Sequence, residues 1–228
     1  MVSPAALLTL IAMPVFAPEP PPQSIYIYRE RLRPGAEAEY GRVEEDAARI
    51  CVRLECPNPY LALESVRGSR EVWWLNAFAS EANRHRVYRG YEQNVALTAA
   101  LREITRRKQG LTFEPHETLA TYRSDLSDGS SWRMLGTRFF VITVTDAAKK
   151  GDGCVFEAAR GREAPKQKWF VVVPAATRSE ADRKAATAGP GTRVFAIRPA
   201  WCLPAEAWIA ADPDFWQASP AAPARKRP

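Results

Sequence analysis

Histidine is nearly absent from this sequence, which contains only His85 and His116 among its 228 residues. Neither histidine stands at a ligand spacing with the loose Cys51-x4-Cys56 pair, so we expect no metal site. The sequence also lacks a Gly-rich phosphate loop and a nucleophile elbow. No motif therefore specifies a reaction or a cofactor, the catalytic residues stay unknown, and the question of enzyme activity stays open.

Basic charge is present but not concentrated, although the formal net charge is +6 and the pI is near 9.3. The densest basic clusters lie at 102–108, near the end of a predicted helix, and at 225–227, in the tail. Cations at a helix C-terminus complement the helix dipole, and a short basic tail is commonly solvated. Since no basic-aromatic motif or recognition-helix pattern accompanies these clusters, we expect no nucleic-acid partner.

Charged side chains are missing from the first 17 residues, which contain an apolar stretch from Ala5 to Ala17. This stretch is too short to span a bilayer comfortably and fits the hydrophobic region of a secretory signal, with Val15-Phe16-Ala17 resembling a cleavage site. No Lys or Arg precedes it and Pro18 would follow the cut, so an uncleaved anchor and a poorly ordered N-terminus are the alternatives. We expect a secreted or periplasmic protein without a stable membrane span.

The four cysteines form an even number, which suits an exported protein. Pairing Cys51 with Cys56 would close a small loop at the end of a predicted helix. Pairing Cys154 with Cys202 would tie two strands together in the C-terminal half. Spacing alone proves neither disulfide.

Strand-like and helix-like segments alternate from Ser24 onward, after a Pro-rich spacer. The predicted elements are strands over 24–29, 60–66, 71–78 and 118–123 and helices over 36–54 and 80–104. Ser80 is a natural N-cap for the second helix, and Gly90 in its middle is expected to kink or split it. The order β-α-β-β-α-β is that of a ferredoxin-like unit, in which two helices cover one face of a four-stranded antiparallel sheet.

Two distant stretches are alike: EVWWLNAFASEANR at 71–84 and KWFVVVPAATRSEADR, which begins at Lys168. Segments before and after them also match in the same order, so we interpret 137–199 as a second copy whose helices are trimmed, the first of them to 146–153. Shared turn and cap chemistry is the alternative explanation. A second copy would cover the bare face of the first sheet, which commonly produces a barrel.

We therefore expect an α+β protein with a ferredoxin-like βαββαβ repeat, a degenerate second repeat, and antiparallel sheets packed as an intrachain α/β barrel. The expected segments are a signal-like segment and Pro-rich spacer (1–23), the first repeat (24–127), the degenerate repeat (132–216) and a disordered basic tail (217–228).

Residues 24–126 resemble the dimeric α/β-barrel superfamily, which includes antibiotic-biosynthesis-monooxygenase-like and NIPSNAP-type domains. The resemblance rests on the strand-Arg-x-x-Pro-Gly-helix opening from Tyr28 to Ala36 and on the strand that leads into a Ser-Glu helix start from Val72 to Arg84. It covers nearly half of the chain well and 137–199 weakly. These motifs specify a fold and no reaction.

The resemblance implies a ligand between sheet and helices, because the superfamily includes cofactor-independent oxygenases and haem-degrading enzymes. The resemblance to haem-degrading members implies a set of three residues: an Asn on the first strand, a Trp on the third strand and a His on the next helix. Here Trp73 or Trp74 and His85 fall near the last two positions. The first strand offers Tyr26 and Tyr28 and no Asn, so the set is incomplete.

The candidate ligand site consists of aromatic, polar and titratable positions on this unit: Tyr28, Glu64, Trp73, Trp74, Asn76, His85 and Tyr88. Strand alternation places Trp73 and Trp74 on opposite faces, one toward the helices and one toward the second sheet. The alternatives are core packing for the aromatic residues, an exposed helix face for His85, and ion pairs with a basic neighbour for Glu64 and Glu157. His116 is interpreted as a loop residue.

These features predict an exported α/β-barrel protein of unknown role that binds a small apolar or aromatic ligand. A cofactor-independent or haem-linked monooxygenase-like enzyme is one alternative, and a non-catalytic protein-interaction module is another. The sequence leaves the oligomeric state open.

Overall fold

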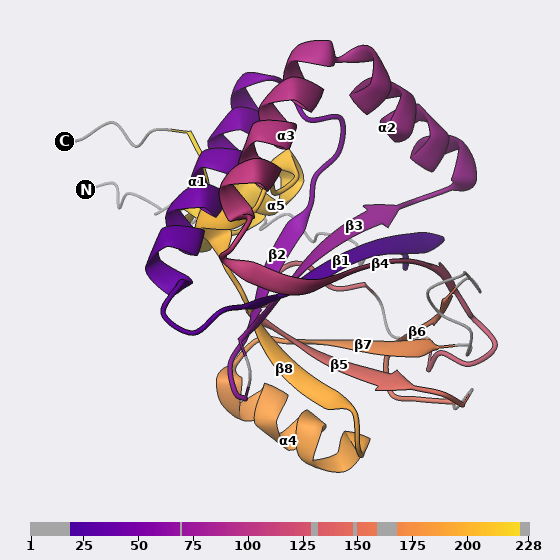
Figure 1. Cartoon of the computed structure of the whole chain (residues 1–228). Coiled ribbons are helices and arrows are strands. Elements are labelled where there is room, and N and C mark those ends of the chain that lie inside the picture. The colour runs from indigo at the N-terminus through magenta and orange to yellow at the C-terminus, as the bar shows by residue number, and fades with distance from the viewer. Residues whose placement is uncertain (1–18, 69, 129–131, 148–149, 159–167, 224–228) are drawn as a thin grey trace, which may run out of the picture.

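The strands of the chain form a closed barrel. The computed structural model describes residues 19–68, 70–128, 132–147, 150–158 and 168–223, and in them eight strands pair in the order β1-β3-β2-β8-β5-β7-β6-β4 and return to β1. Neighbouring strands run antiparallel throughout. This is the α+β fold with an intrachain barrel that the sequence predicts (Figure 1).

The first half of the chain supplies a four-stranded sheet in the order β4-β1-β3-β2, covered on its outer side by helices. Its elements are β1 (Ser24–Leu32), α1 (Glu37–Arg53), β2 (Leu61–Ser65), β3 (Glu71–Phe78), α2 (Glu81–Gln93), α3 (Val95–Lys108) and β4 (Thr112–Tyr122). The side chain of Ser80 caps α2 by accepting a hydrogen bond from the Asn83 amide, as expected for an N-cap.

The second half supplies a sheet in the order β8-β5-β7-β6, the same relative order as in the first half. Its elements are β5 (Phe139–Thr145), β6 (Cys154–Ala158), β7 (Trp169–Ala175), α4 (Arg178–Ala188) and β8 (Thr192–Ile197). The short helix expected over 146–153 is wrong for the described residues of that segment, which form bends and a bridge. Only α4 therefore covers this sheet from outside within the described residues (Figure 1).

Two short ladders join the halves into one barrel. On one side β2 pairs with β8 through Leu63↔Ile197 and the next two residue pairs. On the other side β4 pairs with β6 through Ala120↔Ala158 and the next two pairs. Each sheet thus covers the inner face of the other, so the inner faces of both sheets are buried.

The barrel interior is filled by large apolar side chains around Trp73. The Trp73 ring is fully buried, and its centre lies 4.8 Å from that of Phe195 and 6.3 Å from that of Phe170, both from the second half. The interior is therefore a packed core.

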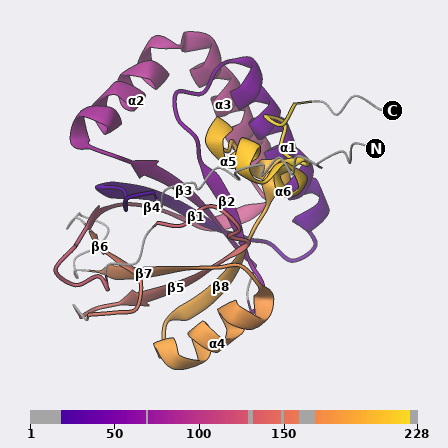
Figure 2. The same cartoon turned by 180° about the vertical axis from the view of Figure 1, so that it is seen from behind.

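The C-terminal segment packs beside α1, as Figure 2 shows from behind. It comprises the 3-10 turn η1 (Pro199–Trp201) and the short helices α5 (Glu206–Ala211) and α6 (Pro213–Trp216). Ser219 is buried and its hydroxyl donates to the Cys202 carbonyl at 3.1 Å. Residues 217–223 are therefore not part of a disordered tail, because they pack on the core; 224–228 lie outside the described residues.

Two boundaries differ from those expected. The second helix splits at Asn94, whose side chain caps α3, rather than at Gly90, which packs against Pro57 so closely that a Cβ would lie 2.8 Å from the Pro57 Cβ. The last strand of the first half begins at Thr112, so His116 lies in β4 and not in a loop. Pro115 is tolerated there because it lies at a register shift of the β1–β4 ladder, between the pairs Arg29↔His116 and Arg31↔Phe113.

Candidate functional site

Trp73 and Trp74 lie on opposite faces of β3, as strand alternation predicts. Trp73 points into the barrel, while Trp74 points toward the helices, where its ring centre lies 5.6 Å from that of Tyr28 and 6.3 Å from that of Tyr40. The two tryptophans therefore belong to two different environments and cannot line one pocket.

A buried cluster of charges lies on the helix side of Trp74. The Lys108 ammonium, at the end of α3, lies 2.8 Å from a Glu30 carboxylate oxygen and 3.0 Å from a Glu44 carboxylate oxygen. Its nitrogen also lies 4.5 Å from the centre of the Trp74 ring, a cation–π contact. The Tyr40 hydroxyl donates to Glu30 at 2.8 Å. The sequence alone does not predict this cluster, because its charged members lie far apart in the chain, on β1, α1 and α3.

The protonation of the cluster follows from burial and pairing. Burial lowers the pKa of Lys108, but the carboxylates of Glu44 and Glu30 together outweigh burial and raise that pKa above its ordinary value. Burial also raises the pKa of Glu44, and the neighbouring Lys108 offsets only part of this. Burial and the nearby Glu30 raise the pKa of Tyr28 to about 12. We interpret the cluster as a packed polar joint between sheet and helices.

The other expected site residues do not gather around Trp74. The side chain of His85 is 54% exposed and reaches Glu81 of its own helix at 3.4 Å, so its place is the exposed helix face. Tyr88 packs edge-on against Phe78 with ring centres 5.9 Å apart. The set Tyr28, Glu64, Trp73, Trp74, Asn76, His85 and Tyr88 is thus spread over several environments.

The two rim glutamates form ion pairs with arginines, as the sequence predicts. Glu64 lies 2.6 Å from Arg198 at the seam with β8, and 3.9 Å from Arg70. Glu157 pairs with Arg123. These contacts hold neighbouring segments of the barrel rim together.

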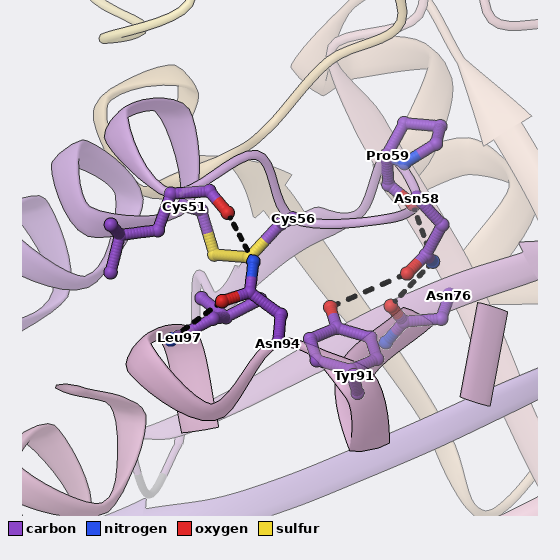
Figure 3. The surroundings of a disulfide bond; sticks show 9 residues. Cys51, Cys56, Asn58, Pro59, Asn76, Tyr91, Asn94 and Leu97 are labelled. Carbon is purple, nitrogen blue, oxygen red and sulfur yellow. Dashed lines mark hydrogen bonds between the residues drawn. A yellow bond between two sulfur atoms is a disulfide. The ribbon is translucent and has the colours of Figure 1, made fainter. Parts of the chain in front are cut away.

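Asn76 belongs to a hydrogen-bonded joint beside a disulfide (Figure 3). Its side-chain oxygen accepts a hydrogen bond from the Asn58 amide group at 2.9 Å, and Tyr91 donates to Asn58 at 3.4 Å. A disulfide joins Cys51 to Cys56 in the loop that carries Asn58. The loop between α1 and β2 is therefore fixed both to β3 and to α2.

Cys154 and Cys202, the other pairing considered from the sequence, are not joined and both are buried. The Cys202 sulfur accepts a hydrogen bond from the Ala62 amide at 3.1 Å and donates to the Arg198 carbonyl at 3.1 Å. Burial raises the pKa of the Cys202 thiol to about 12. Cys202 is thus a packed thiol that links η1 to β2.

A groove of about 890 Å³ lies on the outer face of the second sheet. Its floor is formed by outward-facing side chains of β5 and β7, and one wall is formed by α4. The lining from these elements comprises Val141, Thr143, Thr145, Val171, Val173, Pro174, Ala175, Glu180, Lys184, Thr187 and Ala188. Helices cover the outer face of the first sheet, whereas α4 is the one helix that covers the second sheet in the described part of the chain, and the groove lies beside it.

Glycines let the connection from β5 to β6 form the opposite wall. A Cβ on Gly153 would lie 2.7 Å from a Val173 methyl carbon and 2.8 Å from the Val172 carbonyl oxygen, and a Cβ on Gly151 would lie 3.1 Å from Val171. Gly153 also has a φ of +144°. The chain lies so close to β7 because these positions lack side chains.

Charged groups border the groove without converging on one point of it. Lys184 reaches Glu180 at 2.9 Å and donates to the Pro174 carbonyl at 2.9 Å. Arg133, Lys150, Asp128 and Asp152 contribute to the lining from the other side. The described lining contains no histidine, cysteine, serine or aromatic side chain, so it offers an apolar floor with a mixed polar rim.

Among the described residues, no group of His, Cys, Asp and Glu side chains is arranged to hold a metal ion. None of the helices in the described part of the chain combines the length and apolar content needed to cross a bilayer.

Comparisons with known proteins concern the fold. No family model and no curated protein matches the chain. A "putative monooxygenase" from Fusobacterium nucleatum has 10% identity and a TM-score of 0.47, over 81% of this chain and 94% of that one. An anthrone oxidase-like protein has 10% identity and a TM-score of 0.47, over 77% and 92%. A "putative monooxygenase" from Lactobacillus acidophilus has 10% identity and a TM-score of 0.41, over 77% and 93%.

The architecture itself confirms the expected resemblance at the level of the fold. Two antiparallel sheets with the same strand order close one eight-stranded barrel, which is the intrachain α/β barrel that the resemblance implies. The structural similarities carry no information on activity.

Proposed function

We propose that the protein binds a small, largely apolar molecule in the groove on the outer face of the second sheet. The observation that supports this proposal is the groove itself, whose volume of about 890 Å³ lies within the range of ~300–1,000 Å³ common for small-molecule sites. Val141, Val171 and Val173 would contact the apolar body of the ligand.

The polar rim would set the orientation of the ligand. Thr143 and Thr145 alternate with Val144 on β5 and contribute hydroxyl groups to the same face as the valines. Lys184 and Glu180 form an ion pair at the α4 wall and would contact a polar substituent at the edge. A mostly apolar lining with a few polar groups is typical of sites that bind small molecules.

The proposal is for binding and not for catalysis. The described lining brings no histidine, cysteine or serine to the groove, and its Lys184 is held in an ion pair with Glu180. The monooxygenase-like alternative would place its ligand near Trp74, where Lys108, Tyr28 and Tyr40 are already packed against the ring.

The test uses the fluorescent probe 1-anilinonaphthalene-8-sulfonate on the folded full chain. Ala188→Trp adds a large side chain to the groove wall, and Ala186→Trp adds the same side chain to an exposed position of the same helix that does not line the groove. We expect the probe to bind about tenfold more weakly to A188W than to the wild type, and A186W to bind like the wild type. Equal probe binding by the two variants would overturn the proposal.

We also propose that the chain is exported. The Cys51–Cys56 disulfide supports this, because structural disulfides persist in oxidising compartments. Cell fractionation should find the full chain outside the cytoplasm, whereas a variant with Leu8→Arg and Leu10→Arg, which interrupts the apolar stretch, should stay inside. Identical distribution of both proteins would contradict export.

A further inference from the structure

One end of the barrel interior contains more positive than negative charge. Arg29 and Arg31 on β1 and Arg193 on β8 lie on the inward-facing register, because Ile27 on β1 and Phe195 on β8 belong to the barrel core. The buried carboxylate among them is that of Glu71, at the start of β3.

Both carboxylate oxygens of Glu71 already accept hydrogen bonds. One of its oxygens accepts from the Arg31 Nε at 3.0 Å, and the other accepts from the Trp73 indole at 3.1 Å and lies 3.4 Å from Arg193. Arg31 also reaches Glu114 at 2.9 Å. Two of the arginines are therefore paired with Glu71, which leaves the charge of the third to be balanced.

Arg29 is that third arginine. Its guanidinium carbon lies 5.7 Å from the centre of the Trp73 ring, and no ion pair or side-chain hydrogen bond joins it to another described residue. Burial lowers the pKa of Arg29, the charge of Glu71 offsets part of this, and Arg193 and Arg31 lower the pKa further. An anion next to Arg29 would offset both its burial and the repulsion from Arg193 and Arg31.

Arg29 is one of the residues that line a small cavity. The cavity measures about 50 Å³ and is lined by Arg29, Glu30, Arg31, Glu71, Glu114 and His116. Glu30 is committed to Lys108 on the helix side, at 2.8 Å. A water molecule takes up ~30 Å³ in the liquid. The cavity therefore has room for a group about as large as one or two water molecules.

We propose that this cavity binds the carboxylate group of an anionic ligand, held by Arg29. A planar guanidinium offers two parallel N–H donors to the two carboxylate oxygens, a match that a spherical ion does not make. The three carboxylates of the lining are already paired, Glu71 and Glu114 with Arg31 and Glu30 with Lys108, whereas no ion pair joins Arg29 to another described residue. This site lies apart from the groove between α4 and the second sheet and does not depend on it.

The test is a titration of the full chain with sodium formate, followed by the NMR signals of the arginine Nε–Hε groups. The Arg29 signal, assigned by its loss in Arg29→Gln, should move and saturate with formate. Parallel titrations with sodium chloride and inorganic phosphate at equal ionic strength should move it by less than a third as much. Equal responses to chloride or phosphate and to formate would overturn the carboxylate assignment.

Variants distinguish the site from a general salt effect. Formate should raise the melting temperature of the wild type and not that of R29Q, because only a protein that binds the anion is stabilised by it. Arg29→Lys keeps the charge without the fork and should bind formate at least threefold more weakly. The control is Arg33→Gln, since Arg33 also lies 5.7 Å from a ring, that of Phe113, but does not line the cavity.

The expected result is that R33Q responds to formate like the wild type. A formate response that is lost equally in R29Q and R33Q, or that persists in R29Q, would overturn the proposal. Probe binding in the groove should be unchanged in R29Q, so a failure of this proposal is distinguishable from a failure of the groove proposal.

Discussion

Lys108 and Glu30 meet at 2.8 Å although 78 positions separate them in the chain, and both are buried between the first sheet and its helices. This contact fixes the end of α3 to the middle of β1 directly beside Trp74. The ion pair therefore joins the helix layer to the first sheet.

Replacing Lys108 with methionine should strongly destabilise the fold. The change leaves Glu30 and Glu44 buried without their cation, and removal of one partner from a buried ion pair costs about 3–5 kcal/mol. Urea unfolding would measure the loss. The triple variant K108M/E30Q/E44Q should recover most of it, and an equally unstable triple variant would contradict this explanation.

Glu44→Gln should change how stability depends on pH. The pKa of Glu44 is raised in the folded state, so the folded protein binds this proton more readily than the unfolded chain does, and stability falls as the pH rises above the ordinary glutamate value of 4.5. The variant lacks this loss, so it should match the wild type below pH 4.5 and exceed it at neutral pH.

Thermal unfolding from pH 4 to pH 8 would measure the difference. Glu39→Gln, which removes an exposed carboxylate from the same helix, is the control and should run parallel to the wild type. If E44Q also runs parallel, the raised pKa of Glu44 is wrong.

Reduction of the Cys51–Cys56 disulfide should lower stability modestly. The disulfide spans five positions, and the loss of a loop of this length corresponds to about 2 kcal/mol in the chain-entropy model. Dithiothreitol should lower the melting temperature of the wild type and leave that of Cys56→Ala unchanged. A similar effect of the reductant on both proteins would show that this disulfide is not the cause of the change.

Gly153→Ala should disturb both the fold and the groove. The added Cβ would meet Val173 at 2.7 Å and the Val172 carbonyl at 2.8 Å, so a loss of at least about 2 kcal/mol is expected. Gly35→Ala, at a φ of +84° with open space around it, should cost only about 1 kcal/mol.

Probe fluorescence on these two variants provides the second measurement. Because Gly153 shapes one wall of the groove, only G153A should weaken the binding of 1-anilinonaphthalene-8-sulfonate. Weaker binding by G35A as well would show that the probe reports stability rather than the groove.

Local signals in the sequence predicted the strands and caps well. β3 runs from Glu71 to Phe78 as expected, and Ser80 caps the next helix, because alternation and capping depend on neighbouring residues. The start of β4 was missed because Pro115 argues against a strand unless it lies at an edge or a bulge, and the register shift that accommodates it is a property of the pairing between β1 and β4.

The candidate sites were predicted poorly for a related reason. The charged cluster brings together Glu30, Glu44 and Lys108, and the cavity at the barrel end brings together Arg29 and Glu71, so each exists only after distant segments meet. The groove lies beside the connection from β5 to β6, whose described residues form no helix. The sequence suggested Trp73 and Trp74 as ligand-binding residues. In the structure Trp73 packs in the barrel core and Trp74 packs between the first sheet and its helices.

The two seams of the barrel, β2–β8 and β4–β6, have a consequence for how copies of this chain can associate. Each seam joins one half of the chain to the other through three residue pairs, so two chains that exchanged halves would rebuild both seams with the same partners. The link between the halves opposes this exchange, because Trp132 is buried against Phe140 and Phe156 and would have to leave the barrel first. Trp132 thus fixes the link between the halves to the core, and its contacts stabilise the closure of the barrel within one chain.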